Sequence, residues 1–242
     1  IYHMKIDILA IGAHPDDIEL GAGATIAKEI AQGKTVGMID LTRGELGTRG
    51  TAETRDAEAE AAKNILGASF RINMGFADGF FVNDKEHQLK LIAMIRKFQP
   101  DIVLCNAFDD RHIDHPKGSN LASDACFLSG LIKVKTIDDE GNEQGPWRPS
   151  KVYHYTQWKN VQPDFVVDVS GYLAIKLAAA LAYKTQFHQQ DSDEPITPIS
   201  TTNFKDSLTY RAQDLGRLIG TTHAEGYNVE RYVAVKSLSD LI

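Results

Sequence analysis

The chain of 242 residues contains 26 lysines and arginines against 33 aspartates and glutamates, so its formal net charge is −7. Hydrophobic residues make up 43% and charged residues 24%, which is the composition of an ordinary soluble globular protein and excludes intrinsic disorder. The acidic balance argues against a nucleic-acid partner, because phosphates would be repelled. No apolar run of about 18 residues occurs, so we expect no membrane-spanning helix and no membrane partner.

The two cysteines, Cys105 and Cys126, belong to no CxxC pair. A disulfide framework, a cysteine-based zinc site and a redox motif are therefore not expected. We predict a cytoplasmic protein without a signal peptide. The first three residues precede Met4 and are interpreted as an expression remnant. The length suits one α/β domain, so we predict a single domain over residues 4–242.

Short apolar runs alternate with longer amphipathic segments along most of the chain. The apolar runs predict strands at residues 5–12, 35–41, 70–74, 101–105, 151–157 and 165–169. Helices are predicted at residues 18–32, 53–66, 85–98, 172–187 and 204–218. A loop is predicted at residues 112–118, followed by a further helix that ends at residue 130. This alternation is typical of right-handed βαβ crossovers. The predicted fold class is therefore Rossmann-like α/β, a mostly parallel sheet with helices on both faces.

The first predicted strand ends in His14-Pro15-Asp16-Asp17, at the edge where open parallel sheets bind ligands. A proline followed by acids is also an ordinary helix start, stabilised by the helix dipole, and this alternative explains the acids without any chemistry. It does not explain His14. An imidazole three residues before Asp17 places two zinc ligands on one side of the first helical turn. Asp16 then stays free to act as a general base.

A dinucleotide site is the rival interpretation for this region. The segment Gly21-Ala-Gly23-Ala-Thr-Ile26 loosely matches a glycine-rich fingerprint, but it begins nine residues beyond Gly12 rather than in the strand-to-helix turn. Its sixth position is Ile26, where the fingerprint has Gly or Ala. We therefore expect these glycines to allow close packing of the first helix on the sheet.

A second polar cluster, Asp109-Asp-Arg-His112-Ile-Asp114-His115, follows the fourth predicted strand. A solvated charged loop is the plain alternative. However, the cluster falls on the same sheet edge as His14 and supplies the third ligand that a catalytic zinc site needs. One of His112 and His115 is expected to bind the metal and the other to face the substrate, and the spacing does not decide which. Asp114 is expected to hydrogen-bond the substrate-facing imidazole and to raise its pKa.

Together, in this order and with this placement, the two motifs resemble the LmbE/PIG-L family of zinc-dependent N-acetylglucosamine deacetylases. The family signature AHPDD is intact at residues 13–17, and the later signature HPDH is present at residues 112–115 with Ile113 in place of proline. The resemblance implies an LmbE-like fold. It also implies the metal ligands His14, Asp17 and His115, the general base Asp16, and a role for His112, supported by Asp114, in assisting the tetrahedral intermediate.

Within the family, the bacillithiol-pathway branch of N-acetylglucosaminyl-malate deacetylases is the most similar. Residues 40–45, 47–51, 109–112 and 224–227, together with Arg55, carry this likeness. A malate aglycone has two carboxylates, which arginine recognises in a bidentate manner. The predicted substrate-binding residues are Arg55, Arg111 and Arg49. For each of them, a surface arginine with a solvated partner is the alternative. For His223 two alternatives stay open: a late loop that returns to the active site, and a structural histidine.

The predicted function is hydrolysis of the N-acetyl group of an N-acetylglucosaminide, with N-acetylglucosaminyl-malate as the expected substrate. Zinc is the expected cofactor and iron(II) the alternative metal. Two other functions stay open: a deacetylase acting on another N-acetylglucosamine-containing substrate, and a non-catalytic metal- or sugar-binding protein of the same fold. The expected partner is thus a small sugar. The resemblance further implies a homo-oligomer, a hexamer in this branch.

Overall fold

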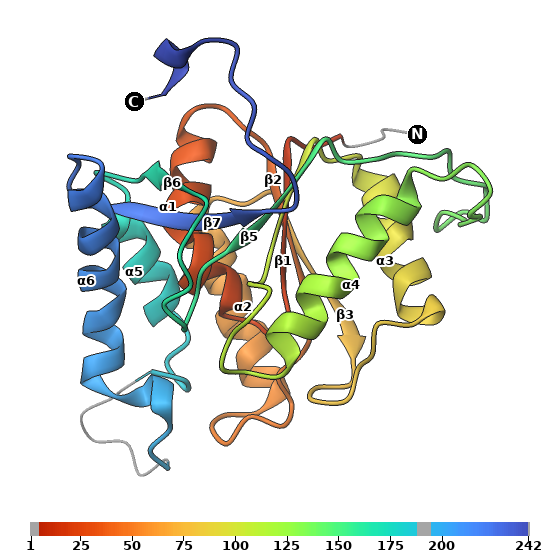
Figure 1. The fold of residues 1–242 in the computed structure, drawn as a ribbon. Helices are drawn as coiled ribbons and strands as arrows, with labels where there is room; N and C mark the ends of the chain where they lie inside the picture. The colour runs from red at the N-terminus through yellow and green to blue at the C-terminus, as the bar shows by residue number, and fades with distance from the viewer. Residues whose placement is uncertain (1–4, 188–194, 242) are drawn as a thin grey trace.

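A single sheet organises the computed structural model, which describes residues 5–187 and 195–241. Across these ranges the strand order is β3-β2-β1-β4-β5-β7-β6 (Figure 1). The strands are β1 (Ile8–Gly12), β2 (Val36–Thr42), β3 (Phe70–Phe76), β4 (Ile102–Cys105), β5 (Lys151–Tyr155), β6 (Phe165–Asp168) and β7 (Ala224–Val229). The interpretation of the first three residues as an expression remnant concerns a segment outside the described residues.

The sheet is parallel from β3 to β5, and β7 runs antiparallel to both of its neighbours, β5 and β6. The predicted fold class, a mostly parallel α/β sheet, is confirmed. The sequence did not predict β7, which lies between β5 and β6. Because β1 and β4 are parallel neighbours, their carboxyl ends lie together at one edge of the sheet.

Helices cover both faces of the sheet, as predicted. They are α1 (Asp17–Ala31), α2 (Ala52–Leu66), α3 (Lys85–Phe98), α4 (Asp114–Ser129), α5 (Leu173–Leu181) and α6 (Thr202–Leu218), with short 3-10 turns η1 (Pro198–Ser200) and η2 (Leu238–Asp240). Helices α3 and α4 pack together on one face, and α1, α2 and α5 pack together on the other (Figure 1). Each face encloses its own cluster of buried hydrophobic residues.

Two helix boundaries differ from the prediction by more than two residues. Helix α5 ends at Leu181 instead of continuing to residue 187, and α4 begins at Asp114 instead of after a loop at 112–118. Pro116 lies in the first turn of α4, where a proline is tolerated because the backbone N–H of this turn has no helical partner. The second polar motif therefore lies partly in the first turn of a helix.

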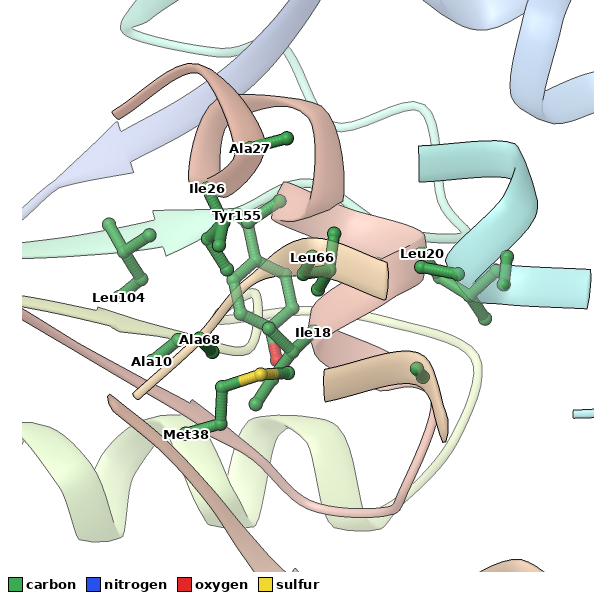
Figure 2. Packing of buried hydrophobic residues seen from close by; sticks show 14 of the residues in the cluster. Ala10, Ile18, Leu20, Ile26, Ala27, Met38, Leu66, Ala68, Leu104 and Tyr155 are labelled. Carbon is green, nitrogen blue, oxygen red and sulfur yellow. The ribbon is translucent and has the colours of Figure 1, made fainter. Parts of the chain in front are cut away.

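Close packing of α1 on the sheet requires a glycine at position 21. A Cβ atom placed on Gly21 would lie 2.0 Å from Cδ2 of Tyr155, a fully buried residue of β5. The Tyr155 hydroxyl donates a hydrogen bond to the carbonyl of Ile11, 3.0 Å away, which ties β5 to β1 across the core. Figure 2 shows Tyr155 among its apolar neighbours. The glycines of α1 thus serve packing, as the sequence predicted.

Three charged side chains form an almost fully buried cluster between β2, β3 and α1. The Arg71 guanidinium on β3 donates to both carboxylate oxygens of Asp40 on β2, at 2.6 and 2.8 Å, and to Glu19 on α1. The Tyr183 hydroxyl donates a further hydrogen bond to Glu19. Glu19 is therefore one of two carboxylates that a buried arginine neutralises, rather than a solvated acid of the helix start.

Cys105 and Cys126 are both free and buried, in agreement with the prediction that they form no disulfide. In the part of the chain that the structure describes, no helix combines the length and the apolar character needed to cross a bilayer.

Candidate active site

The first motif forms the floor of a cavity at the carboxyl end of β1. Asp17 is the first residue of α1, and its Oδ2 accepts a hydrogen bond from the His14 backbone N–H at 2.9 Å. Two amides fix the same carboxylate: Asn106 donates to Oδ2 at 3.0 Å, and Gln157 donates to Oδ1 at 2.7 Å. Because Asn106 also accepts from the backbone of Ala13, the ends of β1 and β4 are joined directly.

The second motif meets the first at this edge, as the strand placement predicted. The ring centroid of His14 lies 4.5 Å from that of His112 and 5.6 Å from that of His115. His115 is in the first turn of α4, and His112 is two residues before that helix. Both imidazoles are therefore presented at the N-terminal end of a helix, where the dipole favours negative charge.

The donor atoms of these residues fit a small divalent cation. Asp17 lies 3.4 Å from Nδ1 of His14 and 3.1 Å from Nε2 of His115, through different carboxylate oxygens. Ligand atoms about 2.0–2.2 Å from a tetrahedral zinc ion lie roughly 3.4 Å apart, so the spacing suits zinc. Among the described residues, two groups have donor atoms that all lie within 4.8 Å of one another: His14 with His112 and His115, and His14 with Asp78 and Asp114. Asp17 belongs to neither group and adjoins the first through its separate contacts with His14 and His115.

The contacts of His112 and His115 distinguish these two histidines. The Asp110 carboxylate lies 2.7 Å from Nδ1 of His115 and leaves Nε2 directed at Asp17. A carboxylate on the far nitrogen is the usual support of a metal-bound histidine. The Nδ1 atom of His112 instead accepts the backbone N–H of Asp114 at 3.3 Å, and its ring is only half-buried. This difference favours His115 as ligand and His112 as the group that faces the cavity.

The electrostatics of the floor favour positive charge. Burial opposes protonation of His14, but hydrogen bonds to Asp114, Asp17 and Asp78 raise its pKa well above the ordinary value. For His115, Asp17 and Asp110 outweigh burial and raise the pKa to about 9. The carboxylates around the floor thus create a field that favours a cation.

Asp16 has an unusual backbone conformation. Its φ of 109° lies in the left-handed region, which is costly for a residue other than glycine, and such strain concentrates at functional sites. The side chain makes no capping hydrogen bond, and the residue is 5% exposed. Burial raises the pKa of Asp16 to about 7, although the charge of Arg55 opposes this shift. A buried carboxyl that titrates near neutrality suits a general base.

The Asp114 prediction is wrong in its contacts. The Asp114 carboxylate accepts hydrogen bonds from the Gly79 backbone at 2.7 Å and from Lys117 at 2.9 Å, and it lies 3.4 Å from Nε2 of His14. The hydrogen bond between Asp114 and His112 comes from the backbone N–H of Asp114, not from its carboxylate. The charge of Asp114 does favour a higher pKa of His112, as predicted, but burial and then the charges of His14 and His115 outweigh it, so the pKa of His112 is lowered. Asp114 therefore supports His14.

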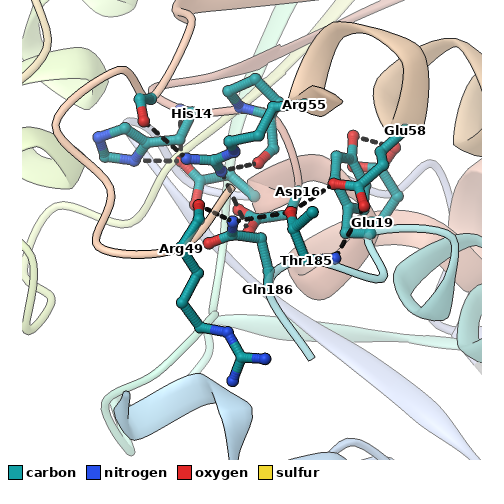
Figure 3. A network of polar contacts seen from close by, with 12 residues as sticks. His14, Asp16, Glu19, Arg49, Arg55, Glu58, Thr185 and Gln186 are labelled. Atoms are coloured by element: carbon teal, nitrogen blue, oxygen red, sulfur yellow. Dashed lines mark hydrogen bonds and ion pairs between the residues drawn. The ribbon is translucent and has the colours of Figure 1, made fainter. Parts of the chain in front are cut away.

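The three predicted arginines have different environments. Arg55 lines the cavity, but its guanidinium donates to the carbonyls of Pro15 and Gly44 and lies 3.4 Å from Asp16. Arg49 is buried, and Figure 3 shows its guanidinium directed away from His14 and Asp16. Arg111 is exposed at the cavity mouth, 4.6 Å over the ring of Trp158. Of the three guanidinium groups, that of Arg111 is the one exposed at the cavity mouth.

Several residues that sequence reasoning missed hold the site together. Asp78, in the β3–α3 connection, lies 3.1 Å from Nε2 of His14. Asn106 and Asp110 could have been found, because they follow β4 at the ligand-binding edge. Gln157, two residues beyond the end of β5, carries the same signal. His223 is not among the cavity-lining residues; its Nδ1 lies 3.0 Å from the hydroxyl of Thr222.

These residues enclose a cavity of about 540 Å³. This volume falls within the range of about 300–1,000 Å³ that is typical of small-molecule sites. Trp158, Ile199 and Phe204 form one wall of the cavity. A larger cavity of about 930 Å³ lies beside α6 and is lined without any histidine. The smaller cavity is the candidate active site.

The fold and this site define a class: an α/β protein with a cluster of histidines and carboxylates, able to hold a cation, at the ends of parallel strands. Residues 9–126, which contain both motifs, match the family model "PIG-L: GlcNAc-PI de-N-acetylase". An uncharacterized deacetylase of Escherichia coli K12, YaiS, is 30% identical over 186 residues, which are 74% of this chain and 90% of that protein. The chain belongs to the PIG-L/LmbE family.

Two further relatives cover almost the whole chain. The diacetylchitobiose deacetylase of Thermococcus kodakarensis is 28% identical over 90% of this chain and 81% of its own length. The crystal structure of the conserved protein TT1542 from Thermus thermophilus superimposes with a TM-score of 0.84 at 34% identity, and covers 95% of this chain and 97% of that chain. The family resemblance and the LmbE-like fold are confirmed.

Proposed function

We propose that this protein hydrolyses the N-acetyl group of an N-acetylglucosaminide and releases acetate and a free amine, with a divalent cation held by His14, Asp17 and His115. The observation that supports this proposal most is the convergence of these residues around the buried, strained Asp16 in one cavity. The relatives named as deacetylases of acetylated sugars support the reaction class.

When bound, zinc or iron(II) supplies Lewis acidity to water and to the amide carbonyl. Asp16 takes the proton from the attacking water and passes it to the departing nitrogen. His112, at the N-terminal end of α4, donates a hydrogen bond to the oxygen on which negative charge develops. Asp110 and Asp114 keep the rings of His115 and His14 in place.

A non-catalytic binding protein is the competing function. It has no need for a strained backbone at Asp16 or for a half-buried imidazole directed into the cavity. N-acetylglucosaminyl-malate is the finer expectation for the substrate, and Arg111 is the predicted arginine that supports it. The homo-oligomer and the cytoplasmic location stay predictions.

The experiment is amine release from N-acetylglucosamine and from its malate conjugate, by zinc-loaded protein and by the same protein after chelation. We expect release that chelation abolishes and that zinc restores. A preference for the malate conjugate would support the finer expectation. No release from either substrate by protein of verified zinc content would favour the binding protein.

A further inference from the structure

Three exposed apolar side chains lie around the mouth of the candidate active site. Leu46 is 62% exposed, Phe80 77% and Ile113 63%, and all three line the same cavity as the histidines of its floor. They come from three different connections, β2–α2, β3–α3 and the start of α4. Scattered apolar residues are normal on a protein surface, but a cluster at the mouth of a polar cavity calls for an occupant.

The two connections that carry Leu46 and Phe80 are held directly by residues of the site. Asp78, which contacts His14, accepts a hydrogen bond from the Leu46 backbone at 2.9 Å. The neighbouring Gly79 donates to Asp114 at 2.7 Å and accepts from Lys117 at 2.9 Å. These bonds fix the backbone of the two connections relative to the floor. Such fixation is what a specificity pocket needs, because little ordering entropy is lost on binding.

Leu46 and the β3–α3 connection are also in contact with each other. A Cβ atom on Gly79 would lie 3.4 Å from Cδ1 of Leu46, so the leucine packs against this turn. Ile113 lies between His112 and Asp114, at the position where the family signature has proline. Leu46, Phe80 and Ile113, called here the apolar rim, therefore each adjoin residues that contact the proposed reaction centre.

The charges at the mouth do not match a strongly anionic group. Arg111 is the exposed charged residue among the cavity-lining residues, and its guanidinium lies over Trp158. Arg55 is committed to Pro15, Gly44 and Asp16. One exposed cation beside three apolar side chains favours a mainly apolar group.

We propose that the apolar rim is an aglycone subsite, which binds an alkyl or aryl group attached to the N-acetylglucosamine unit. This inference rests on the proposed deacetylation for the placement of the sugar on the floor. The apolar group removes the rim from water, and that burial adds affinity in proportion to its area. A subsite of this kind makes N-acetylglucosaminides with an apolar aglycone the preferred substrates, in place of the malate conjugate that the sequence predicted.

The test measures the affinity of zinc-loaded protein by calorimetry for the methyl, phenyl, octyl and malyl N-acetylglucosaminides, with amine release followed in parallel. We expect the phenyl and octyl compounds to bind about tenfold more tightly than the methyl compound, a difference of about 1.4 kcal/mol. Phe80→Ser and Ile113→Ser should each reduce this ratio. Ile132→Ser, at a similarly exposed isoleucine (70%) outside the cavity, is the matched control and should keep it.

Equal affinity for all four compounds, or tightest binding of the malyl compound, would overturn the subsite. An equal loss of the apolar preference in Ile132→Ser would also overturn it. So would rim variants that keep the affinity ratio but dissociate an oligomer in light scattering, since a second copy of the chain would then cover the rim. The phenyl and octyl arms distinguish aryl from alkyl recognition. If the apolar preference appears without any amine release, the deacetylase proposal fails and the subsite stands. If amine is released from all compounds and none of them binds more tightly than the others, the subsite fails and the deacetylase proposal stands.

Discussion

The guanidinium of Arg55 lies 3.4 Å from the carboxylate of Asp16, and both side chains are buried (Figure 3). The sequence predicted an arginine that reaches outward to a substrate carboxylate. The structure instead places a cation beside the proposed base, where it favours the ionised form. Arg55 is therefore a positioning residue for Asp16, which it also holds through the carbonyl of Pro15.

This pair makes the pH profile informative. Asp16 acts only when ionised, so kcat/KM should rise as the pH increases through its pKa. Burial raises that pKa to about 7, and a bound cation lowers it, so the acidic limb of the zinc enzyme is expected below pH 7. Arg55→Gln removes a charge that lowers the pKa, so the limb should move to higher pH. Arg55→Lys keeps the charge and should leave the limb near its original position.

Arg43→Gln serves as the control for this profile, because Arg43 is exposed and pairs with Asp56 away from the cavity. Its limb should not move. A limb that stays in place in Arg55→Gln, or that moves to lower pH, would mean that Asp16 is not the group whose ionisation limits the reaction.

Asp16→Asn tests the base itself. The amide keeps the shape of the side chain but cannot take a proton, so kcat should fall by about 10²–10⁴-fold. Zinc content should stay the same, because the proposed ligands are His14, Asp17 and His115. The measurement is single-turnover amine release together with metal analysis. Retained activity would show that another group accepts the proton, and lost zinc would show that Asp16 is a ligand.

Asp110→Asn tests the support of His115. The asparagine leaves the imidazole in place but weakens the contact now made by the carboxylate at 2.7 Å. Zinc affinity should fall about 10–100-fold, the usual effect of removing such a carboxylate. Competition with a chelator measures it. Asp109→Asn is the matched control: Asp109 is the adjacent aspartate, exposed and paired with Lys159, and its loss should not alter zinc affinity. Equal affinity in both variants would remove His115 from the ligand set.

The sequence predicted the parts of the site that strand ends control. The first motif follows β1 and the second follows β4, and the ends of parallel neighbours meet at one edge whatever the loops do. Asp78 escaped prediction because its place beside His14 depends on how the β3–α3 connection folds back. The role of Arg55 escaped prediction because two of its partners are backbone carbonyls, which leave no trace in a residue pattern.

The fold, like the site, has elements that the sequence predicts and elements that depend on contacts with distant parts of the chain. Strand β7 was missed because Ala224-Glu-Gly-Tyr-Asn-Val229 has neither a continuous apolar run nor clean alternation. Its Glu225 is buried and forms an ion pair with Lys176 at 2.6 Å, and it accepts the backbone N–H groups of Ala24 and Thr25. These contacts come from distant parts of the chain. A strand whose polar residue is satisfied by α1 and α5 cannot be found from its own composition.

Arg71 provides a prediction about stability. It neutralises Glu19 and Asp40, whose side chains are at most 2% exposed, so Arg71→Met leaves two buried carboxylates without a cation. Removing one partner from a buried ion pair costs about 3–5 kcal/mol of unfolding free energy. Chemical denaturation followed by circular dichroism measures it. The control is Arg43→Met, which breaks exposed pairs with Glu53 and Asp56 and should cost no more than about 1 kcal/mol. Equal losses of stability in Arg71→Met and Arg43→Met would mean that water reaches the Arg71 cluster. A rescue experiment adds Glu19→Gln and Asp40→Asn to Arg71→Met. Restored stability in this triple variant would confirm that uncompensated charge is the cause.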